Sequence, residues 1–357
     1  MGSVIHLNVP FRQSTKAARQ AALIDRFATQ RRPQNDVFWL KENAELLNVL
    51  DSTGAELDAS ALEPLAEVYD TLHRRLGFFP QYYRFLVSIC LDLEDLGLVG
   101  NKGHVAVDWV VSEGLADAEL SDLQRAEARR LCLRRGVDPF EGDTGLDDRL
   151  RAFGARQDTF ALPNKKAAYE LTHIVFYLSE YGRQNPDLPD AFVRSLHFAG
   201  TLAFLELNTD LLAEICIALR FSGQTPPAIW ENWISDQARG FICSSDELGW
   251  AGDDYHPFLM TNWFMNVAGM GGFGVQVPDG PISFEAPRPS VAPLRELSEC
   301  MYQMEGVRSS DWPSMRKVLD GVLSTEAREV VDAAETAVDF EAFFAGFART
   351  GLQGASA

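Results

Sequence analysis

The fold is decided by one stretch of sequence, Leu211-Leu212-Ala213-Glu214-Ile215-Cys216-Ile217-Ala218-Leu219, which is apolar on every face of a helix except at Glu214. Residues 257–268 share this pattern. Because a helix that is apolar all round is buried on all sides, we expect both segments in the inner layer of a helical protein. Helical periodicity extends through almost the whole chain, and strand alternation is nearly absent. The sequence therefore predicts an all-α fold.

A regular interval separates residues on alternate expected helices. Cys90, Cys132, His173, Glu214 and His256 follow one another at steps of 42, 41, 41 and 42 residues. An interval of about 40 residues is the length of one hairpin of two helices, as found in helical arrays. We therefore expect a helical-hairpin array that closes into an (α/α)6 toroid-like domain. Its inner helices are predicted over residues 81–97, 118–135, 164–182, 209–222, 256–269 and 311–321.

The expected toroid-like domain spans residues 77–350 and follows an N-terminal helical extension over residues 1–76. Residues 351–357 are expected to be a disordered tail, as chain ends often are. One long segment, residues 270–290, lacks helical periodicity and is rich in Gly and Pro. It is interpreted either as a domain linker or as a loop over one mouth of the ring.

Composition restricts the class of protein. The formal net charge of −19 argues against nucleic acid and anionic membranes as partners, because both need a basic surface. No window approaches the about 20 apolar residues of a membrane span, and no secretory signal opens the chain. The five cysteines are scattered without a CxxC pair, which is typical of reduced thiols. These features predict a soluble, cytoplasmic, acidic protein.

The candidate site consists of His173, Asp210, Glu214 and His256, which the hairpin interval brings to one place. A carboxylate on a buried helix needs a cation, a hydrogen bond or a proton to offset its desolvation. Two imidazoles and two carboxylates are suitable ligands for zinc, with iron as an alternative. Each residue also has a structural interpretation. Asp210 would help its helix to start, Glu214 would pair with an arginine such as Arg220, and His256 would pack beside Asp253 or Asp254 at a helix start.

Glu170 and Tyr177 share a helical stripe with His173 and are the predicted catalytic residues, lining the cavity as hydrogen-bonding or acid/base groups. The spacing Glu170-x-x-His173 also matches a di-iron carboxylate motif. A solvated helix face is the structural alternative for this stripe.

The motif Asp253-Asp254-Tyr255-His256, followed by an apolar helix and Gly269, resembles the zinc-histidine motif of protein prenyltransferase β subunits. Those proteins are (α/α)6 toroids and are related in fold to the terpene cyclases. The resemblance implies that His256 is a zinc ligand, and that Glu214-x-Cys216 stands where that family has Asp-x-Cys. As a whole, the chain resembles an uncharacterised bacterial family of helical proteins, which implies no activity.

Together these patterns predict an intracellular metal-dependent enzyme with a small, apolar substrate in a central helical cavity. Its reaction would be that of a transferase, a lyase or a hydrolase. The alternative is a metal-free helical array that binds a partner or acts as a scaffold. A third interpretation is a metal-free acid/base site with His173 as base and Glu214 as the residue that orients it.

Overall fold

The computed structural model describes residues 13–245 and 252–350, and the expected disordered tail at 351–357 lies outside these ranges. The described residues form 18 α-helices, three short 3-10 helices and one sheet of two strands. The all-α class predicted from the sequence is therefore confirmed. In these two ranges we find no helix whose length and apolar character would suit a membrane crossing.

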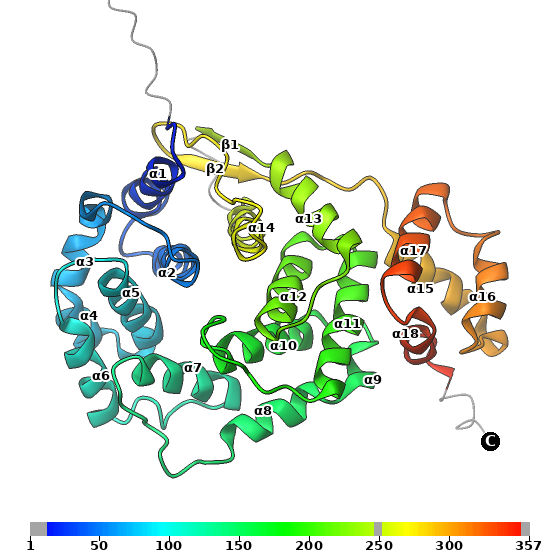
Figure 1. Cartoon of the computed structure of the whole chain (residues 1–357), viewed down its shortest axis with the longest axis horizontal. Coiled ribbons are helices and arrows are strands. Elements are labelled where there is room, and N and C mark those ends of the chain that lie inside the picture. Colours follow the sequence, from blue (N-terminus) through cyan, green and yellow to red (C-terminus); the bar gives the residue numbers. More distant parts are fainter. Residues whose placement is uncertain (1–12, 246–251, 351–357) are drawn as a thin grey trace, which may run out of the picture.

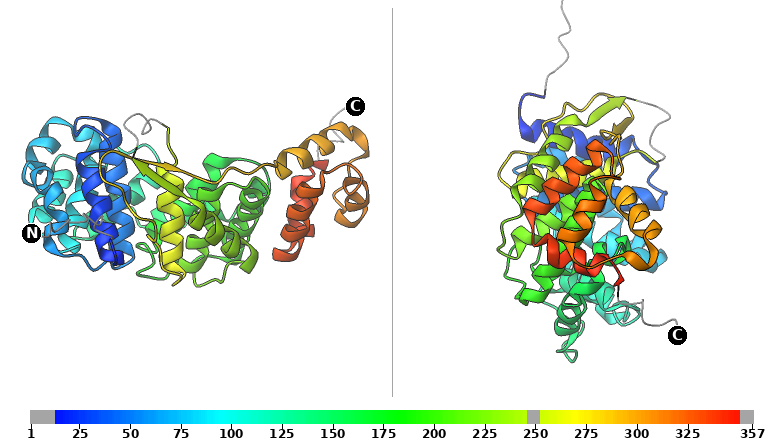
Figure 2. Two further views of the ribbon diagram at one scale, coloured as in Figure 1. Left: turned by 90° about the horizontal axis from the view of Figure 1, so that it is seen from above. Right: turned by 90° about the vertical axis from the view of Figure 1, so that its right-hand side faces the viewer.

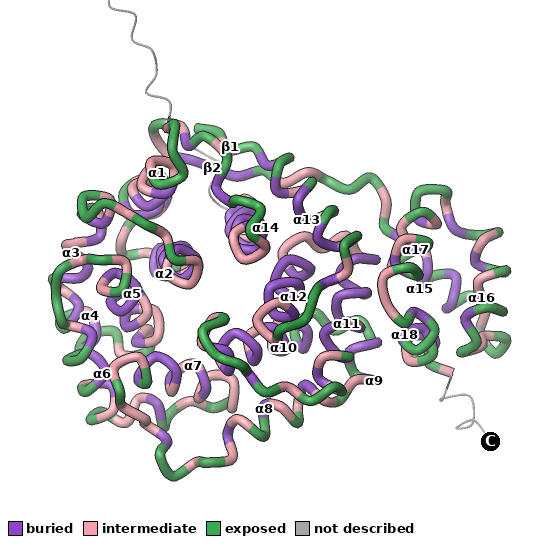
Figure 3. The backbone as a smooth tube through the Cα atoms, viewed as in Figure 1, coloured by how far each residue is buried: buried purple, intermediate pink, exposed green. Residues whose placement is uncertain are grey.

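Six helices form an inner ring in which each helix packs against the next, and the last packs against the first (Figure 1). They are α2 (Val37–Ser52), α5 (Tyr83–Asp95), α7 (Asp122–Leu133), α10 (Lys165–Leu178), α12 (Thr209–Phe221) and α14 (Tyr255–Val267). Figure 3 shows that these helices carry much of the buried backbone. In α12 every residue from Leu211 to Leu219 is buried, as expected for a helix that is apolar on all faces.

A second layer of helices surrounds this ring (Figure 1). It consists of α1 (Lys16–Thr29), η1 (Ala59–Leu65), α3 (Ala66–Asp70), α4 (Leu72–Phe78), η2 (Pro80–Tyr82), α6 (Lys102–Ser112), α8 (Leu146–Gly154), α9 (Gln157–Phe160), α11 (Asp190–Leu205) and α13 (Ala228–Gly240). Inner and outer helices alternate along the chain, so each inner helix returns in the same direction as its neighbour. Residues at equal heights on adjacent inner helices therefore meet.

The ring closes where α2 packs against α14. This differs from the expectation that residues 1–76 form an extension and that residues 311–321 supply the sixth inner helix. The helix in the latter region, α16 (Trp312–Leu319), has an exposed face that includes Val318 and packs on α18 instead. Most of α2 is buried, including Trp39 and Leu47, because it has ring neighbours on both sides.

Four helices after residue 292 form a separate group beside the ring, seen at one end of the molecule in Figure 2. They are α15 (Pro293–Gln303), α16, α17 (Thr325–Ala337) and α18 (Phe340–Phe347), with η3 (Glu305–Val307) between the first two. Trp312 packs between Phe340 and Phe344, with ring centroids 4.6 and 4.7 Å away. The group contacts the ring through α11 and α13.

The Gly- and Pro-rich segment 270–290 lies along α1 and forms a strand. Arg19 and Arg26 on α1 donate hydrogen bonds to the carbonyl oxygens of Phe273 and Pro278. Further along, β2 (Ile282–Glu285) pairs in antiparallel fashion with β1 (Ile242–Ser245). This segment therefore braces the ring from outside, near the point where α14 and α2 meet.

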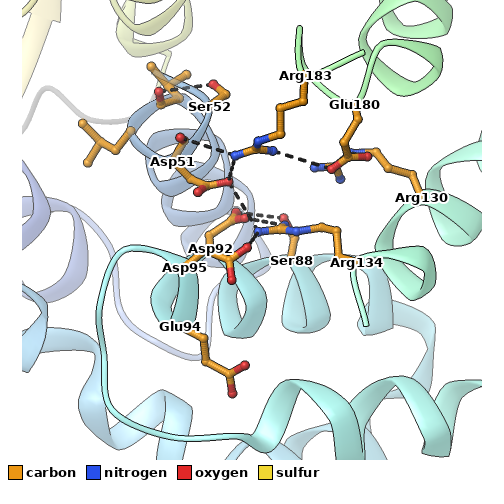
Figure 4. A network of polar contacts seen from close by, with 12 residues as sticks. Asp51, Ser52, Ser88, Asp92, Glu94, Asp95, Arg130, Arg134, Glu180 and Arg183 are labelled. Carbon is orange, nitrogen blue, oxygen red and sulfur yellow. Dashed lines mark hydrogen bonds and ion pairs between the residues drawn. The ribbon is translucent and has the colours of Figure 1, made fainter. Parts of the chain in front are cut away.

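Polar contacts tie the carboxyl-terminal ends of three inner helices together (Figure 4). The Arg134 guanidinium lies 2.6 Å from Asp92 and 2.7 Å from Asp95 at the end of α5, and 3.4 Å from Asp51 on α2. Arg183, after α10, also reaches Asp51 at 2.8 Å. These ion pairs hold α2, α5, α7 and the connection after α10 at one end of the ring.

Candidate functional site

Glu214 is the one charged residue in the buried stretch that decides the fold, and its side chain is only 2% exposed. The Thr172 hydroxyl on α10 donates a 2.7 Å hydrogen bond to Glu214 Oε2. Glu214 Oε1 lies 3.5 Å from His256 Nε2 on α14. Arg220, the structural partner considered from the sequence, instead pairs with Glu231 on α13. Glu214 therefore faces its inner-ring neighbours on both sides.

His256 stands at the centre of the site and meets three carboxylates. Its Nδ1 lies 3.3 Å from Glu45 Oε2 on α2. On the other side of the imidazole, Nε2 lies 3.5 Å from Glu214 Oε1 and 3.8 Å from Asp210 Oδ2. Burial lowers the pKa of His256, but the contacts with Glu214 and Glu45 outweigh it and raise the pKa to about 10. The imidazole is therefore protonated at neutral pH in this arrangement.

Glu45 belongs to the site although no sequence pattern predicted it. Burial raises its pKa, but the hydrogen bond and charge of His256 prevail, so the net pKa is lowered. Lys41, one turn earlier on α2, lies 3.6 Å from the other carboxylate oxygen. Glu45 thus fixes the orientation of the His256 ring from the Nδ1 side.

Asp210 lies in the first turn of α12, but it does not cap this helix. The capping side chain is Asn208, which accepts a hydrogen bond from the Leu211 N–H. Asp210 Oδ2 instead accepts a 2.5 Å hydrogen bond from the Tyr169 hydroxyl on α10. Burial and the nearby Asp210 charge raise the pKa of Tyr169. The Asp210 carboxylate therefore does not cap α12, and it is free to take part in the site.

His173 touches the edge of the cluster with only one ring nitrogen. Its Nδ1 lies 2.7 Å from the Tyr169 carbonyl oxygen and 3.8 Å from Glu214 Oε2. A carbonyl oxygen can only accept, so Nδ1 carries the proton of the neutral ring and Nε2 keeps its lone pair. With 37% of its side chain exposed, His173 is the most open member of the site. The contact of His173 with Glu214 is therefore made through Nδ1, and its role as a metal ligand stays a prediction.

The two predicted catalytic residues lie apart from His256. Glu170 lines a cavity of about 370 Å³ together with Leu123, Arg156 and Ile174. The rings of Tyr177 and His173 pack in a T-shaped arrangement with centroids 5.9 Å apart, and burial raises the pKa of Tyr177 well above the ordinary value. Glu170, His173 and Tyr177 share one stripe of α10, because residues three and four apart are neighbours on a helix, and His173 is the member of this stripe that reaches Glu214.

The residues implied by the prenyltransferase resemblance have mainly structural surroundings. The Cys216 thiol is fully buried, and burial, then the charge of Glu231, raise its pKa well above the ordinary value. Asp253 contacts Arg31 and accepts a hydrogen bond from the Phe284 N–H, while Asp254 accepts one from the Ala286 N–H. Both Asp side chains thus hold the strand β2, and Glu45 is the carboxylate that orients His256.

The structure thus brings together His256, Glu214 and Asp210, with His173 beside them, and adds Glu45, Tyr169 and Thr172. Within the described ranges, no three His, Cys, Asp or Glu side chains are arranged as a group that could hold a metal ion. What the arrangement provides is one imidazole among three carboxylates, and a second imidazole with a free lone pair. Such a cluster can exchange protons, and its excess of negative charge can attract a cation.

Comparison with known proteins identifies the family but no activity. The chain belongs to the family described as a domain of unknown function, DUF6902, whose model matches residues 1–350. Neither the comparison with curated proteins nor that with solved structures gives a match.

Proposed function

We propose that this member of the DUF6902 family is a metal-dependent enzyme whose divalent cation is bound by His256, Glu214 and Asp210. Zinc is the first candidate and iron the second. The observation that carries the proposal is the convergence of three carboxylates on one imidazole at the inner face of the ring.

The charges of the cluster favour a divalent cation. Glu45, Asp210 and Glu214 bring three negative charges, and Lys41 brings one positive charge beside Glu45. A protonated His256 still leaves one carboxylate without a countercharge. If His256 is instead unprotonated, the three carboxylates and Lys41 leave two negative charges, and a divalent cation bound to Nε2 balances both. This matters because unpaired buried charges are costly.

The hydrogen bonds around the cluster are of the kind that surrounds metal ligands. A metal-bound histidine usually donates its other N–H to a carboxylate, and ligating carboxylates are hydrogen-bonded in turn. Glu45 lies on Nδ1 of His256, Thr172 donates to Glu214, and Tyr169 donates to Asp210. Each proposed ligand therefore has its own orienting partner.

The distances are compatible with a site that closes around the ion. Ligand atoms about 2.0–2.1 Å from a tetrahedral zinc ion are about 3.3 Å apart. His256 Nε2 is 3.5 Å from the Glu214 oxygen and 3.8 Å from the Asp210 oxygen. Side-chain shifts of a few tenths of an ångström would complete the group.

A divalent cation held by His256, Glu214 and Asp210 would supply Lewis-acid chemistry to the proposed reaction. His173 supports this chemistry because its Nδ1–H is held by the Tyr169 carbonyl, so Nε2 accepts a proton. Phe176 and Tyr177 place aromatic rings 5.6 and 5.9 Å from the His173 ring. These features favour hydrolysis or a lyase reaction on a small substrate with an apolar part.

The proposal is tested by elemental analysis of protein purified without a metal-affinity tag. We expect near-stoichiometric zinc or iron in the parent, loss of the metal in His256→Ala and Glu214→Gln, and retention in His104→Ala. His104 is an exposed histidine on α6 and serves as the matched control. A parent that holds no metal, even after incubation with zinc, would overturn the metal proposal.

A metal-free binding protein is the second candidate, and one observation favours it. With His256 protonated, each ring nitrogen faces a carboxylate, so the cluster can act as a joint between α2, α12 and α14. In that case Glu45, Glu214 and His256 stabilise the fold, and incubation of the protein with zinc leaves its melting temperature unchanged.

A further inference from the structure

Arg31 lies just after α1 with a side chain that is 0% exposed, and it contacts three separate parts of the ring closure. Its Nε donates a 2.9 Å hydrogen bond to Glu42 on α2. Its two Nη atoms bind both carboxylate oxygens of Asp253 at 2.9 and 3.1 Å, and Nη1 also donates to the Ile282 carbonyl at 2.7 Å. One guanidinium thus joins α2, the residues before α14 and the strand β2.

Aromatic rings enclose this guanidinium. Its central carbon lies 5.0 Å from the ring centroid of Phe27, 5.4 Å from that of Tyr255 and 5.3 Å from that of Phe284. Arginine stacks on aromatic faces and binds carboxylates through a planar fork, whereas lysine offers only a point charge. The surroundings of Arg31 therefore fix its plane as well as its charge.

The carboxylates bound by Arg31 have a regular relation to the site. Glu45 follows Glu42 by three residues on α2, and His256 follows Asp253 by three residues at the start of α14. Glu42 and Glu45 are neighbours on the surface of α2, because residues three apart on a helix lie close together, and Asp253 lies in the turn that leads into α14 two residues before this helix begins. Arg31 joins Glu42 to Asp253, and one turn further along, Glu45 meets His256 at 3.3 Å.

We propose that Arg31 is the positioning residue of the site: by joining Glu42 to Asp253 across the closure of the ring, it sets the register of α2 against α14 and so holds Glu45 on His256 Nδ1. This inference rests on the proposed metal site for its functional meaning. Arg31 itself touches none of the three proposed ligands, so its effect on the metal acts only through the placement of His256.

The variant Arg31→Lys keeps the charge and loses the planar fork. We expect it to weaken zinc binding about 10- to 100-fold, the usual effect of removing a partner that orients a ligand. The matched control is Arg134→Lys, because Arg134 is also buried and also joins two helices through Asp51 and Asp92, but it contacts no residue of the site. Zinc affinity is measured by chelator competition, and folding by circular dichroism and thermal unfolding.

The expected result is a comparable loss of melting temperature in both variants but a loss of zinc affinity in Arg31→Lys alone. Equal zinc affinity in Arg31→Lys and the parent, or an equal loss in both variants, would overturn the proposal. If Arg31→Lys does not fold, Asp253→Asn replaces it. That variant keeps an acceptor for the Phe284 N–H but weakens the pair with Arg31, and at least a several-fold loss of affinity is expected.

Failure of the metal site itself is detected separately. If the parent binds no zinc, nuclear magnetic resonance on ¹⁵N-histidine-labelled protein tests the same positioning role. The Nδ1–H signal of His256, assigned by its loss in His256→Ala, is expected at the position of a hydrogen-bonded proton in the parent and in Arg134→Lys. In Arg31→Lys we expect it to shift or to exchange away, and an unchanged signal would refute the positioning role.

Discussion

Glu45, in the middle of α2, and His256, in the first turn of α14, are 211 positions apart in the sequence, yet Glu45 Oε2 lies 3.3 Å from His256 Nδ1. This contact joins the first and the last helix of the inner ring. Because Glu45 occupies the Nδ1 side of the imidazole, Nε2 is directed at Glu214 and Asp210. The same contact therefore closes the ring and orients the histidine of the candidate site.

Replacing Glu45 with Gln tests its role directly. The variant keeps an acceptor of similar size and removes one of the two carboxylate charges, those of Glu214 and Glu45, that raise the pKa of His256. We expect the pKa of His256 in zinc-free protein to fall by about 1–3 and zinc affinity to fall by about 10- to 100-fold. A histidine titration by nuclear magnetic resonance measures the first, and chelator competition the second. Glu56→Gln, at an exposed position, is the control, and an unchanged pKa in Glu45→Gln would contradict the assignment.

The hairpin interval made part of the site predictable from the sequence. Hydrogen bonds join Tyr169 to Asp210 at a separation of 41 residues, and Thr172 to Glu214 at a separation of 42. The same separation of 42 joins Asp92 to Arg134 at the end of the ring. Neighbouring inner helices run in the same direction, so residues one hairpin apart meet at equal heights. Applying the interval to hydroxyl residues would also have found Tyr169 and Thr172.

The hairpin interval does not predict that Glu45 belongs to the site. The contact between α2 and α14 spans the whole ring, so no local interval marks it. Closure depends on the sum of the packing angles between all six inner helices, which periodicity does not encode. Both α2 and α16 have helical patterns, and only burial on both sides distinguishes the inner helix α2 from α16, which has an exposed face. The sequence thus predicted the repeating unit better than where the ring closes.

The raised pKa of His256 makes the stability of the zinc-free protein depend on pH. In the unfolded chain the pKa of histidine is about 6.5, whereas in the folded protein it is about 10. The stabilisation that protonated His256 provides through its contacts with Glu214 and Glu45 is therefore complete below about pH 6.5 and is lost as the pH rises towards 10. We expect the free energy of unfolding to fall by up to a few kcal/mol more in the parent than in His256→Gln over this range. Urea unfolding at pH 6.5 and 10 measures this, and parallel losses in both proteins would refute it.

The hydroxyl of Thr172 is expected to stabilise the fold through Glu214. Thr172→Val preserves the shape of a fully buried side chain but removes the 2.7 Å hydrogen bond to a buried carboxylate. Hydrogen bonds to charged groups contribute about 1.5–3 kcal/mol, so the free energy of unfolding should fall by about that amount. Thr201→Val is the matched control, because the buried Thr201 hydroxyl bonds only to the His197 carbonyl of its own helix. Chemical denaturation should show a clearly smaller loss there, and equal losses would contradict the special role of Thr172.

The ion pairs at the end of the ring supply a prediction about stability alone. Arg134→Met leaves the Asp92 carboxylate, whose side chain is 0% exposed and whose pKa burial already raises, without its guanidinium partner. Removing one partner of a buried pair costs about 3–5 kcal/mol. Replacing both residues with apolar ones avoids the unpaired charge, so Arg134→Met with Asp92→Leu should cost less than Arg134→Met alone.

Arg149→Met is the matched surface control for Arg134→Met. Arg149 pairs with Asp122, and both side chains are about two-fifths exposed. Exposed pairs contribute little to stability because water screens their charges, so the loss in the free energy of unfolding should be small. Urea unfolding of the four proteins measures the series. If Arg134→Met loses no more stability than Arg149→Met, the network in Figure 4 does not hold the ring together.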